Sequence, residues 1–384
     1  MSFGPHVSLE IVGAIDDAFL YRTSLYIVSG DRLLRCRTSN LRQRLQQRFA
    51  EEAEYVTALL PSTVPNRRTW PVETEDRRSI DLRLTLDELD CEEIDTGGAI
   101  PAGALLDLTI FRDRLFLGTI DGLLTGDLDQ DELGTTIDHL GQRSAARCEA
   151  ISVGLSSMAA SYGDAGFTIY ADELDLQGLG RQDIKFENRS HRTLWLRYRL
   201  LNLGDGLPDP FVTTTASVTA RDPEDDTGPA HSVLVLKNLR AQADGVQYDD
   251  DVTVVDGFHS SLFGQAGDTL FWMEASGAKA TDRTANYREY AQLTLPQGAT
   301  VLAVSQLGDG NVVVDTTFGV AVSDGVRLRW MANEVAIAVR SFPRSKRYVN
   351  VALATFADRL LLFAGKPGPR PAAGVGRDTH KIVR

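Results

Sequence analysis

Four aspartates in the segment DLDQDELGTTID, residues 127–138, have the spacing of a calcium-binding loop. Asp127, Asp129 and Asp131 occupy alternating positions, and Asp138 stands at the twelfth position. Carboxylate oxygens at this spacing can surround a Ca²⁺ ion, which prefers hard oxygen ligands. However, Glu132 stands where the sharp turn of such a loop needs glycine. The segment therefore has two interpretations, a calcium site or an acidic loop that joins two strands.

The histidines offer a second kind of chemistry, because neutral imidazole is a common ligand of catalytic metals. No two of the six histidines lie at a local metal-ligand spacing such as i and i+4. A fold that joins distant segments could still assemble a metal site for a hydrolase or lyase from His139, His191, His231 and His259. The alternative is that they are separate surface or core residues.

Local signatures of other enzyme classes are absent from the sequence. There is no G-x-S-x-G nucleophile elbow, no H-E-x-x-H zinc motif and no G-x-x-x-x-G-K-[ST] phosphate loop. These absences exclude only the families that carry such motifs, so an enzyme whose site is built from distant segments stays open.

Residues 40–60 form a candidate partner-binding element. Apolar residues recur there at helical spacing, at Leu41, Leu45, Phe49, Ala53, Val56 and Leu60. Ser39 or Asn40 can cap the helix and Pro61 ends it, which predicts one helical insertion over about 39–60. Its basic residues come early and its acidic residues late, against the preference of the helix dipole. Either the helix packs on the rim of its own sheet, or its charged face, with Arg44 and Arg48, docks a partner.

The C-terminal residues 366–384 are a second candidate. This segment is rich in Pro and Gly and has almost no apolar content, so we expect a flexible basic tail. It contains Lys366, Arg370, Arg377 and Lys381, and its net charge of +4 leaves −17 on residues 1–365. An acidic body favours basic partners and argues against a general nucleic-acid surface, so nucleic acid would bind only through the tail.

The elements that must position these residues are short strands. Residues 105–128, LLDLTIFRDRLFLGTIDGLLTGDL, predict three antiparallel strands, with a hairpin at Asp121-Gly122. A turn with Asp before an apolar strand recurs at Asp31, Asp113, Asp164, Asp268, Asp309 and Asp358. The intervals between these aspartates are 82, 51, 104, 41 and 49 residues. Most are close to one or two blade repeats of a β-propeller, which are about 40–50 residues long.

The fold we predict is all-β, a single β-propeller of about seven blades, six to eight, over residues 1–365. Residues 7–15, VSLEIVGAI, are expected to complete the last blade, because little β-forming sequence follows Gly365. In its hairpin rhythm the chain resembles degenerate propellers of the kelch or quinoprotein kind. We expect seven residues in the core: Leu115, Leu117, Ile169, Leu270, Phe271, Val313 and Leu361.

The cysteines and the hydropathy pattern bear on location. Cys36, Cys91 and Cys148 are odd in number and far apart, which argues against a disulfide framework or a zinc ribbon. The N-terminal residues lack the pattern of a secretory signal, and no apolar run is long enough for a membrane helix. We therefore expect a cytoplasmic protein that does not bind a membrane.

Two hypotheses of function follow. The first is a non-catalytic propeller that acts as an interaction or scaffold subunit of a cytoplasmic, bacterial multiprotein assembly and needs no cofactor. The alternative is a propeller enzyme with a site in its axial channel. An enzyme should gather titratable side chains with shifted pKa values, whereas a scaffold should expose an apolar patch.

Overall fold

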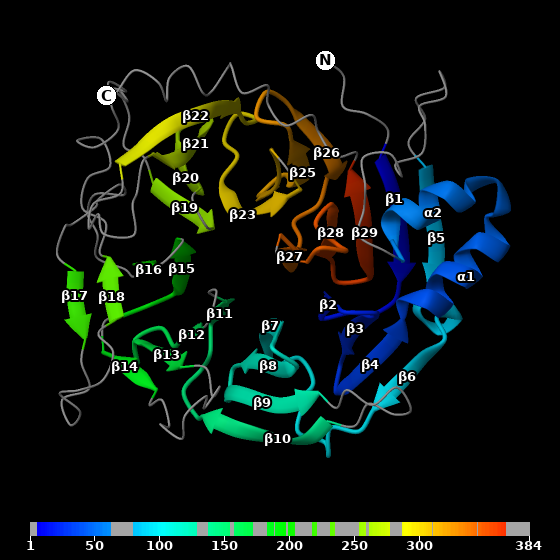
Figure 1. The fold of residues 1–384 in the computed structure, drawn as a ribbon, viewed down its shortest axis with the longest axis horizontal. Coiled ribbons are helices and arrows are strands. Elements are labelled where there is room, and N and C mark those ends of the chain that lie inside the picture. Colours follow the sequence, from blue (N-terminus) through cyan, green and yellow to red (C-terminus); the bar gives the residue numbers. More distant parts are fainter. Residues whose placement is uncertain are drawn as a thin grey trace. The chain divides into compact units, whose positions relative to one another are not determined.

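The computed structural model describes residues 6–62, 80–128, 137–153, 157–171, 183–187, 189–196, 199–203, 217–220, 231–234, 253–258, 261–276, 286–308, 310–343 and 345–365. Within these residues the chain forms strands in seven sheets of four or five strands each, and two α-helices (Figure 1). The predicted all-β propeller of six to eight blades with one helical insertion is confirmed.

The chain divides into two compact units, which are described separately. Unit 1 comprises residues 1–103, 129–139 and 299–384, and unit 2 comprises residues 104–128 and 140–298. The described strands of unit 1 form three sheets. The first contains β2 (Asp17–Tyr21), β3 (Ser24–Ser29), β4 (Arg32–Arg37) and β6 (Cys91–Ile94). The second contains β23 (Val301–Leu307), β24 (Asn311–Thr316), β25 (Gly319–Ser323) and β26 (Leu328–Ala332).

The third sheet of unit 1 joins the two ends of the sequence. Its order is β27 (Ala338–Ser341), β28 (Val351–Thr355), β29 (Arg359–Gly365), β1 (His6–Val12) and β5 (Ile80–Thr85). Strand β1 pairs antiparallel with β29 and parallel with β5. The expectation that the N-terminal strand completes the last blade is therefore confirmed.

The helical insertion consists of two helices rather than one. Helix α1 (Thr38–Arg48) ends at Phe49, a single 3₁₀ turn covers Ala50–Glu52, and α2 (Ala53–Leu59) follows. The residue before α1 is Arg37, and no side chain caps its first turn, so the predicted caps Ser39 and Asn40 are wrong. Both helices lie beside β5 and β1 in Figure 1, and the apolar side chains Leu41, Leu45 and Val56 are buried in the same cluster as Leu9 and Leu84.

The break at Phe49 reverses the argument from the helix dipole. Arg48 is in the last turn of α1, and Glu54 is in the first turn of α2. A cation at a helix C-terminus and an acid at a helix N-terminus are both favourable. The charge order is therefore unfavourable only for one continuous helix, and it gives no support to a docking role.

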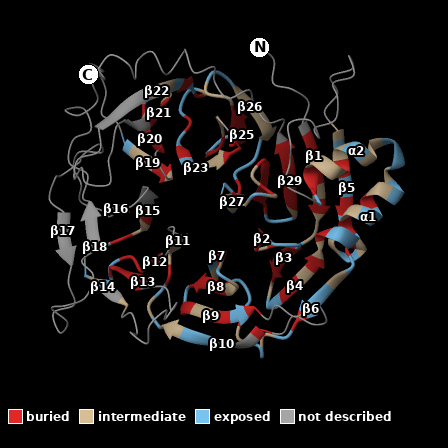
Figure 2. Ribbon diagram, viewed as in Figure 1, coloured by how far each residue is buried: buried red, intermediate tan, exposed pale blue. Residues whose placement is uncertain are grey.

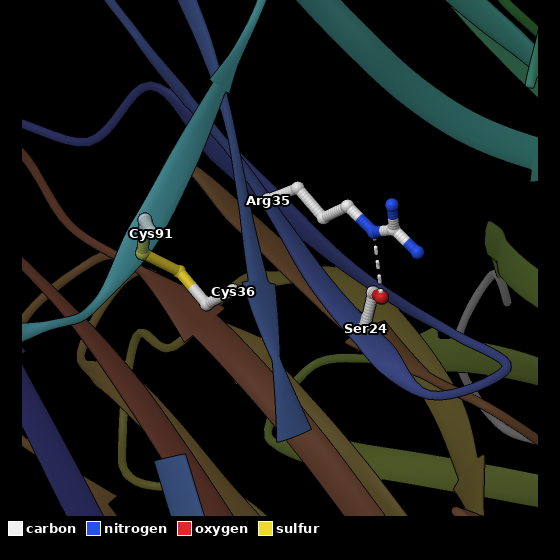
Figure 3. Close-up of a disulfide and its surroundings, with 4 residues drawn as sticks. All are labelled: Ser24, Arg35, Cys36 and Cys91. Atoms are coloured by element: carbon white, nitrogen blue, oxygen red, sulfur yellow. Dashed lines mark hydrogen bonds between the residues drawn. A yellow bond between two sulfur atoms is a disulfide. The ribbon is translucent and has the colours of Figure 1, made fainter. Parts of the chain in front are cut away.

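A disulfide joins Cys36 of β4 to Cys91 of β6, although the number and spacing of the cysteines argued against a disulfide framework. The two residues are direct partners in the antiparallel pair β4–β6, with Cα atoms 4.3 Å apart. The sequence spacing of 55 residues does not indicate this proximity, because the helical insertion and β5 lie between β4 and β6 in the chain. In Figure 3 the neighbouring Arg35 extends away from the disulfide, and its Nε donates a hydrogen bond of 3.0 Å to Ser24 Oγ.

Unit 2 contains four sheets among its described strands. One contains β7 (Leu105–Phe111), β8 (Arg114–Thr119), β9 (Gly122–Leu128) and β10 (Ile137–Ser144), of which residues 137–139 are counted in unit 1. The next contains β11 (Ala150–Val153), β12 (Ser157–Ser161), β13 (Phe167–Ala171) and β14 (Ile184–Phe186). A third has the order β15 (Arg192–Leu196), β16 (Arg199–Leu203), β18 (His231–Leu234) and β17 (Ser217–Ala220), with β16 and β18 parallel. The fourth contains β19 (Thr253–Phe258), β20 (Ser261–Ala266), β21 (Thr269–Ser276) and β22 (Asn286–Thr294).

The recurring Asp turn marks two different hairpins, which explains its irregular period. Asp113 lies between the first and second strands of its sheet, β7 and β8. Asp31, Asp164, Asp268 and Asp358 lie between the second and third strands. The intervals from Asp31 to Asp113 and from Asp113 to Asp164 therefore compare turns at non-equivalent positions in their sheets.

Buried residues occur along most of the described strands, and helices α1 and α2 contribute further buried residues (Figure 2). All seven residues predicted to be in the core are buried, with side chains at most 7% exposed. The predicted hairpin at Asp121-Gly122 is also confirmed, between β8 and β9. Gly122 has a φ of +137°, and a Cβ atom there would lie 1.9 Å from the carbonyl oxygen of Ser144. Gly319 of unit 1 is equivalent, with a φ of +136° and 2.1 Å to the carbonyl oxygen of Ala332.

Candidate functional site

The first strands of the sheets in unit 2 are joined by polar side chains. Asp107 Oδ2 accepts a hydrogen bond of 2.6 Å from the backbone N–H of Ile151, which links β7 to β11. Ser152 Oγ of β11 lies 2.5 Å from Thr193 Oγ1 of β15. Arg192 of β15 forms an ion pair of 3.0 Å with the buried carboxylate of Asp256 in β19. These contacts satisfy buried polar groups and hold neighbouring strands in place.

His191 is the one histidine whose side chain the structure describes. Its Nδ1 lies 2.9 Å from Glu149 Oε2, and the imidazole is 38% exposed. Glu149 also approaches Arg147, with 3.7 Å between Oε1 and Nε. The arrangement places an imidazole beside a carboxylate, as in a general acid–base pair. Among the described residues, no group of three His, Cys, Asp or Glu side chains could hold a metal ion.

Unit 1 contains a buried aspartate with an unusual pKa. Asp315 of β24 is 4% exposed, and burial raises the pKa of its carboxyl to about 7. Backbone N–H groups of Thr316 and Ala336 donate hydrogen bonds to the carboxyl and oppose this increase in its pKa. Among the described residues, the Oδ1 atom has no hydrogen-bond partner. Asp17 of β2 is equally buried, but it forms an ion pair with Arg340 of β27.

Four apolar side chains are exposed at one end of the sheets of unit 1. Leu302 lies at a bulge in β23, Phe318 in the β24–β25 turn, and Val335 and Ile337 directly before β27. Their exposed fractions are 42%, 48%, 46% and 60%. The backbone of Asn333 and Glu334 passes within 3 Å of the Cβ position at Gly319, which brings this segment beside Phe318. We call these four residues the apolar face.

Unit 2 repeats two of these positions. Leu106 is the extra residue of a bulge in β7, and Ile120 lies in the β8–β9 turn. They are 38% and 46% exposed. A bulge places one additional side chain in a strand and turns it away from its normal direction. Both units therefore expose apolar side chains at the bulge in the first strand of a sheet and at the turn between its second and third strands.

The sequence analysis did not identify this face. Leu105-Leu106 and Val301-Leu302 appear as parts of continuous apolar strands, which predicts burial of both residues. One signal could have identified the apolar face. Each of these strands starts with two adjacent large apolar residues, and a bulge can turn only one of them into the core.

The predicted calcium ligands are only partly described. Asp127 is the penultimate residue of β9 and pairs with Arg114, with 2.6 Å between Oδ1 and Nε. Asp129 and Asp131 lie outside the described residues, and Asp138 lies in β10 with its side chain undescribed. The calcium site stays a prediction. If it exists, millimolar calcium should raise the melting temperature, and Asp129→Ala should abolish the increase.

The predicted partner-binding residues have different surroundings. Arg44 is exposed on α1, whereas Arg48 forms an ion pair with Glu88. Lys366, Arg370, Arg377 and Lys381 lie outside the described residues, and so do most side chains of the proposed histidine site. These candidates stay predictions as well.

Comparison with known proteins gives no assignment of function. No protein-family model and no curated protein matches the chain. Similar solved structures include the WD40 β-propeller domain of Doa1, with 10% identity, a TM-score of 0.46, and coverage of 95% of this chain and 97% of that chain. The computationally designed Ika8 protein is 12% identical, with a TM-score of 0.44 and coverage of 94% and 100%. The β-propeller domain of Myceliophteria thermophila Cps50 (Swd1) is 11% identical, with a TM-score of 0.40 and coverage of 69% and 97%.

Proposed function

We propose that this β-propeller is a non-catalytic interaction subunit of a cytoplasmic, bacterial multiprotein assembly, and that the apolar face of unit 1 binds another protein. The observation that supports this proposal is the exposure of Leu302, Phe318, Val335 and Ile337 at one end of neighbouring sheets. Grouped apolar side chains at a surface mark interaction sites, because each loses contact with water when a partner covers it. An aromatic residue such as Phe318 is a typical anchor at the centre of an interface.

The main observation in favour of the alternative, a propeller enzyme, is the pKa of Asp315. A carboxyl whose pKa is near 7, such as that of Asp315, can give and take a proton at neutral pH. Catalysis also needs a second group and access for a substrate. Asp315 is 4% exposed, and backbone N–H groups of Thr316 and Ala336 donate hydrogen bonds to its carboxyl. We therefore prefer the interaction subunit.

The proposal is tested by affinity purification from cells that make the protein, followed by mass spectrometry. Phe318→Asp combined with Ile337→Asp should remove a partner that the wild type retains at constant stoichiometry. Val326→Asp is the matched control, because Val326 is 73% exposed but lies in the β25–β26 turn, at the other end of the same sheet. If the wild type, the double variant and the control variant all recover the same partners, the proposal is contradicted.

The cytoplasmic location is a separate proposal, and the Cys36–Cys91 disulfide makes it testable. Disulfides persist mainly in oxidising compartments, and the cytosol keeps most thiols reduced. Alkylation of the protein directly in cell lysates, followed by mass spectrometry, measures the redox state of Cys36 and Cys91. Reduced thiols at both positions support a cytoplasmic location, and a fully formed disulfide contradicts it. In the described residues no helix is long and apolar enough to cross a membrane.

A further inference from the structure

Asp315 lies beneath the apolar face, next to the residues that form it. In the antiparallel pair of β23 with β24, Asp315 is opposite Ala303, and Leu302 is the bulge residue directly before Ala303. The next residue in β24 is Thr316, whose Oγ1 accepts a hydrogen bond of 3.1 Å from the backbone N–H of Phe318. One buried aspartate therefore adjoins both the bulge and the turn that carry apolar residues of this face.

The carboxyl of Asp315 also anchors segment 333–337, which joins β26 to β27 and carries the other two residues of the apolar face. Ala336 is the one buried residue of this segment, and its backbone N–H donates a hydrogen bond to the Asp315 carboxyl. The N–H of Ile337 donates a hydrogen bond of 2.7 Å to the backbone oxygen of Thr355. The side chain of Ala336 is a single methyl group, so its burial adds little. The carboxyl is therefore the polar anchor at the centre of the segment.

Among the described residues, this carboxyl has backbone donors and no cation as a partner. Its Oδ1 atom has no hydrogen-bond partner among them either. Strands β23, β25 and β28 contain no charged residue. The charged side chains of the other surrounding elements interact elsewhere: Glu334 with Arg359, Arg340 with Asp17, and Arg329 with Asp81. An ionised Asp315 would lose its hydration without gaining an opposite charge, so the observed structure favours the protonated carboxyl.

From this geometry we propose that Asp315 is a pH switch for the apolar face. The protonated carboxyl keeps segment 333–337 in the observed, closed position. Ionisation favours an open position, in which the segment moves away and water reaches the carboxylate. The inference rests on the proposed function, because the closed segment holds Val335 and Ile337 beside Phe318 for a partner.

The direction of the pH dependence follows from burial. In the closed position the pKa of Asp315 is raised to about 7, whereas the ordinary value for aspartate is 3.8. Between these two values the open state binds fewer protons than the closed state. Opening should therefore become more favourable from about pH 4 to pH 7, and should change no further above pH 7. The apolar face is accordingly best ordered in mild acid.

Hydrogen exchange of the backbone amides of residues 335–337 measures this opening in the full chain. After correction for the intrinsic pH dependence of exchange, the protection of these amides should be at least about tenfold lower at pH 8 than at pH 5. The amides of β25 should stay better protected at both pH values, which shows that the segment opens without unfolding of its sheet. Asp315→Asn, which cannot ionise, should give equal protection of residues 335–337 at pH 5 and pH 8.

The matched control is Glu334→Gln, which removes the other carboxyl of the same segment and its exposed ion pair with Arg359. This variant should keep the pH dependence of the wild type. Protection in the wild type that does not change with pH overturns the switch. The same holds if Glu334→Gln abolishes the pH dependence and Asp315→Asn preserves it.

Affinity purification at pH 6 and pH 8 then tests the consequence for binding. The readout is a partner that Phe318→Asp combined with Ile337→Asp fails to retain. The wild type should retain more of this partner at pH 6, and Asp315→Asn should retain equal amounts at both pH values. Equal retention by the wild type overturns the regulatory role. If the double variant keeps every partner, the proposed function fails and the regulatory role fails with it, whereas the exchange data still decide whether Asp315 controls the segment.

Discussion

At the scale of single residues, two buried aspartates of unit 1 have opposite environments. Asp17 forms an ion pair with Arg340, whereas Asp315 has only backbone donors on one side of its carboxyl. The charge of Asp17 is therefore compensated and that of Asp315 is not. Burial of an uncompensated charge is costly, which is why the pKa of Asp315 rises to about 7.

Asp315→Asn should stabilise the protein at pH 8. The folded-state pKa of Asp315 lies above its unfolded value, so the unfolded chain releases its proton at lower pH. The carboxyl therefore destabilises the fold increasingly from about pH 4 to pH 7, and fully above pH 7. Urea unfolding should show a gain of at least about 1 kcal/mol at pH 8 and a smaller gain at pH 5.

Asp17→Asn is the matched control for this measurement. It leaves Arg340 without its buried partner and should destabilise the protein by roughly 3–5 kcal/mol. A gain from Asp315→Asn that is the same at pH 5 and pH 8 contradicts the pKa argument.

At the scale of elements, the turn between β8 and β9 depends on glycine for two reasons. Gly122 combines a positive φ with the close approach of the Ser144 carbonyl oxygen, whereas Gly30 has a φ of +66° in open space. Gly30→Ala should cost about 1–2 kcal/mol from the backbone alone. Gly122→Ala must also move β10 and should cost clearly more, roughly 3 kcal/mol or above, in thermal or urea unfolding. Equal costs would mean that β10 moves away freely.

The disulfide stabilises the pairing of β6 with β4, which follow and precede the helical insertion in the sequence. It closes a loop over 55 positions, and cross-links of this kind contribute about 2–4 kcal/mol, mainly by restricting the unfolded chain. Reduction should lower the free energy of unfolding of the wild type by this amount. The double variant Cys36→Ser, Cys91→Ser should be insensitive to reductant, and Cys148→Ala should stay sensitive, because Cys148 is a free buried thiol. Sensitivity of the double variant to reductant would contradict this role.

At the scale of the whole molecule, the N-terminal strand connects the ends of the chain. Strand β1 lies between β29 and β5, and Leu9 is fully buried there. Leu9→Ala should therefore cost about 2–5 kcal/mol, since it leaves a cavity between elements that are distant in sequence. Glu10→Ala in the same strand removes only partly exposed ion pairs with Arg83 and Arg359 and should change stability by less than about 1 kcal/mol. Similar effects of the two substitutions in chemical unfolding would refute the assignment of β1 to this core.

The sequence by itself determined the features that local pattern controls. Short apolar runs between Gly and Asp turns predicted an all-β propeller, the seven core residues and the closing role of the N-terminal strand, because strand burial and turn geometry depend on neighbouring residues. The tertiary structure alone decided which distant segments meet. It paired Cys36 with Cys91, broke the predicted helix at Phe49, and exposed Leu302 and Ile337 beside Phe318. It also placed the loop of Lys346 and Arg347 against the β2–β3 turn. These contacts depend on the register and bulges of strands that pair across long separations, and no local spacing in the sequence contains that information.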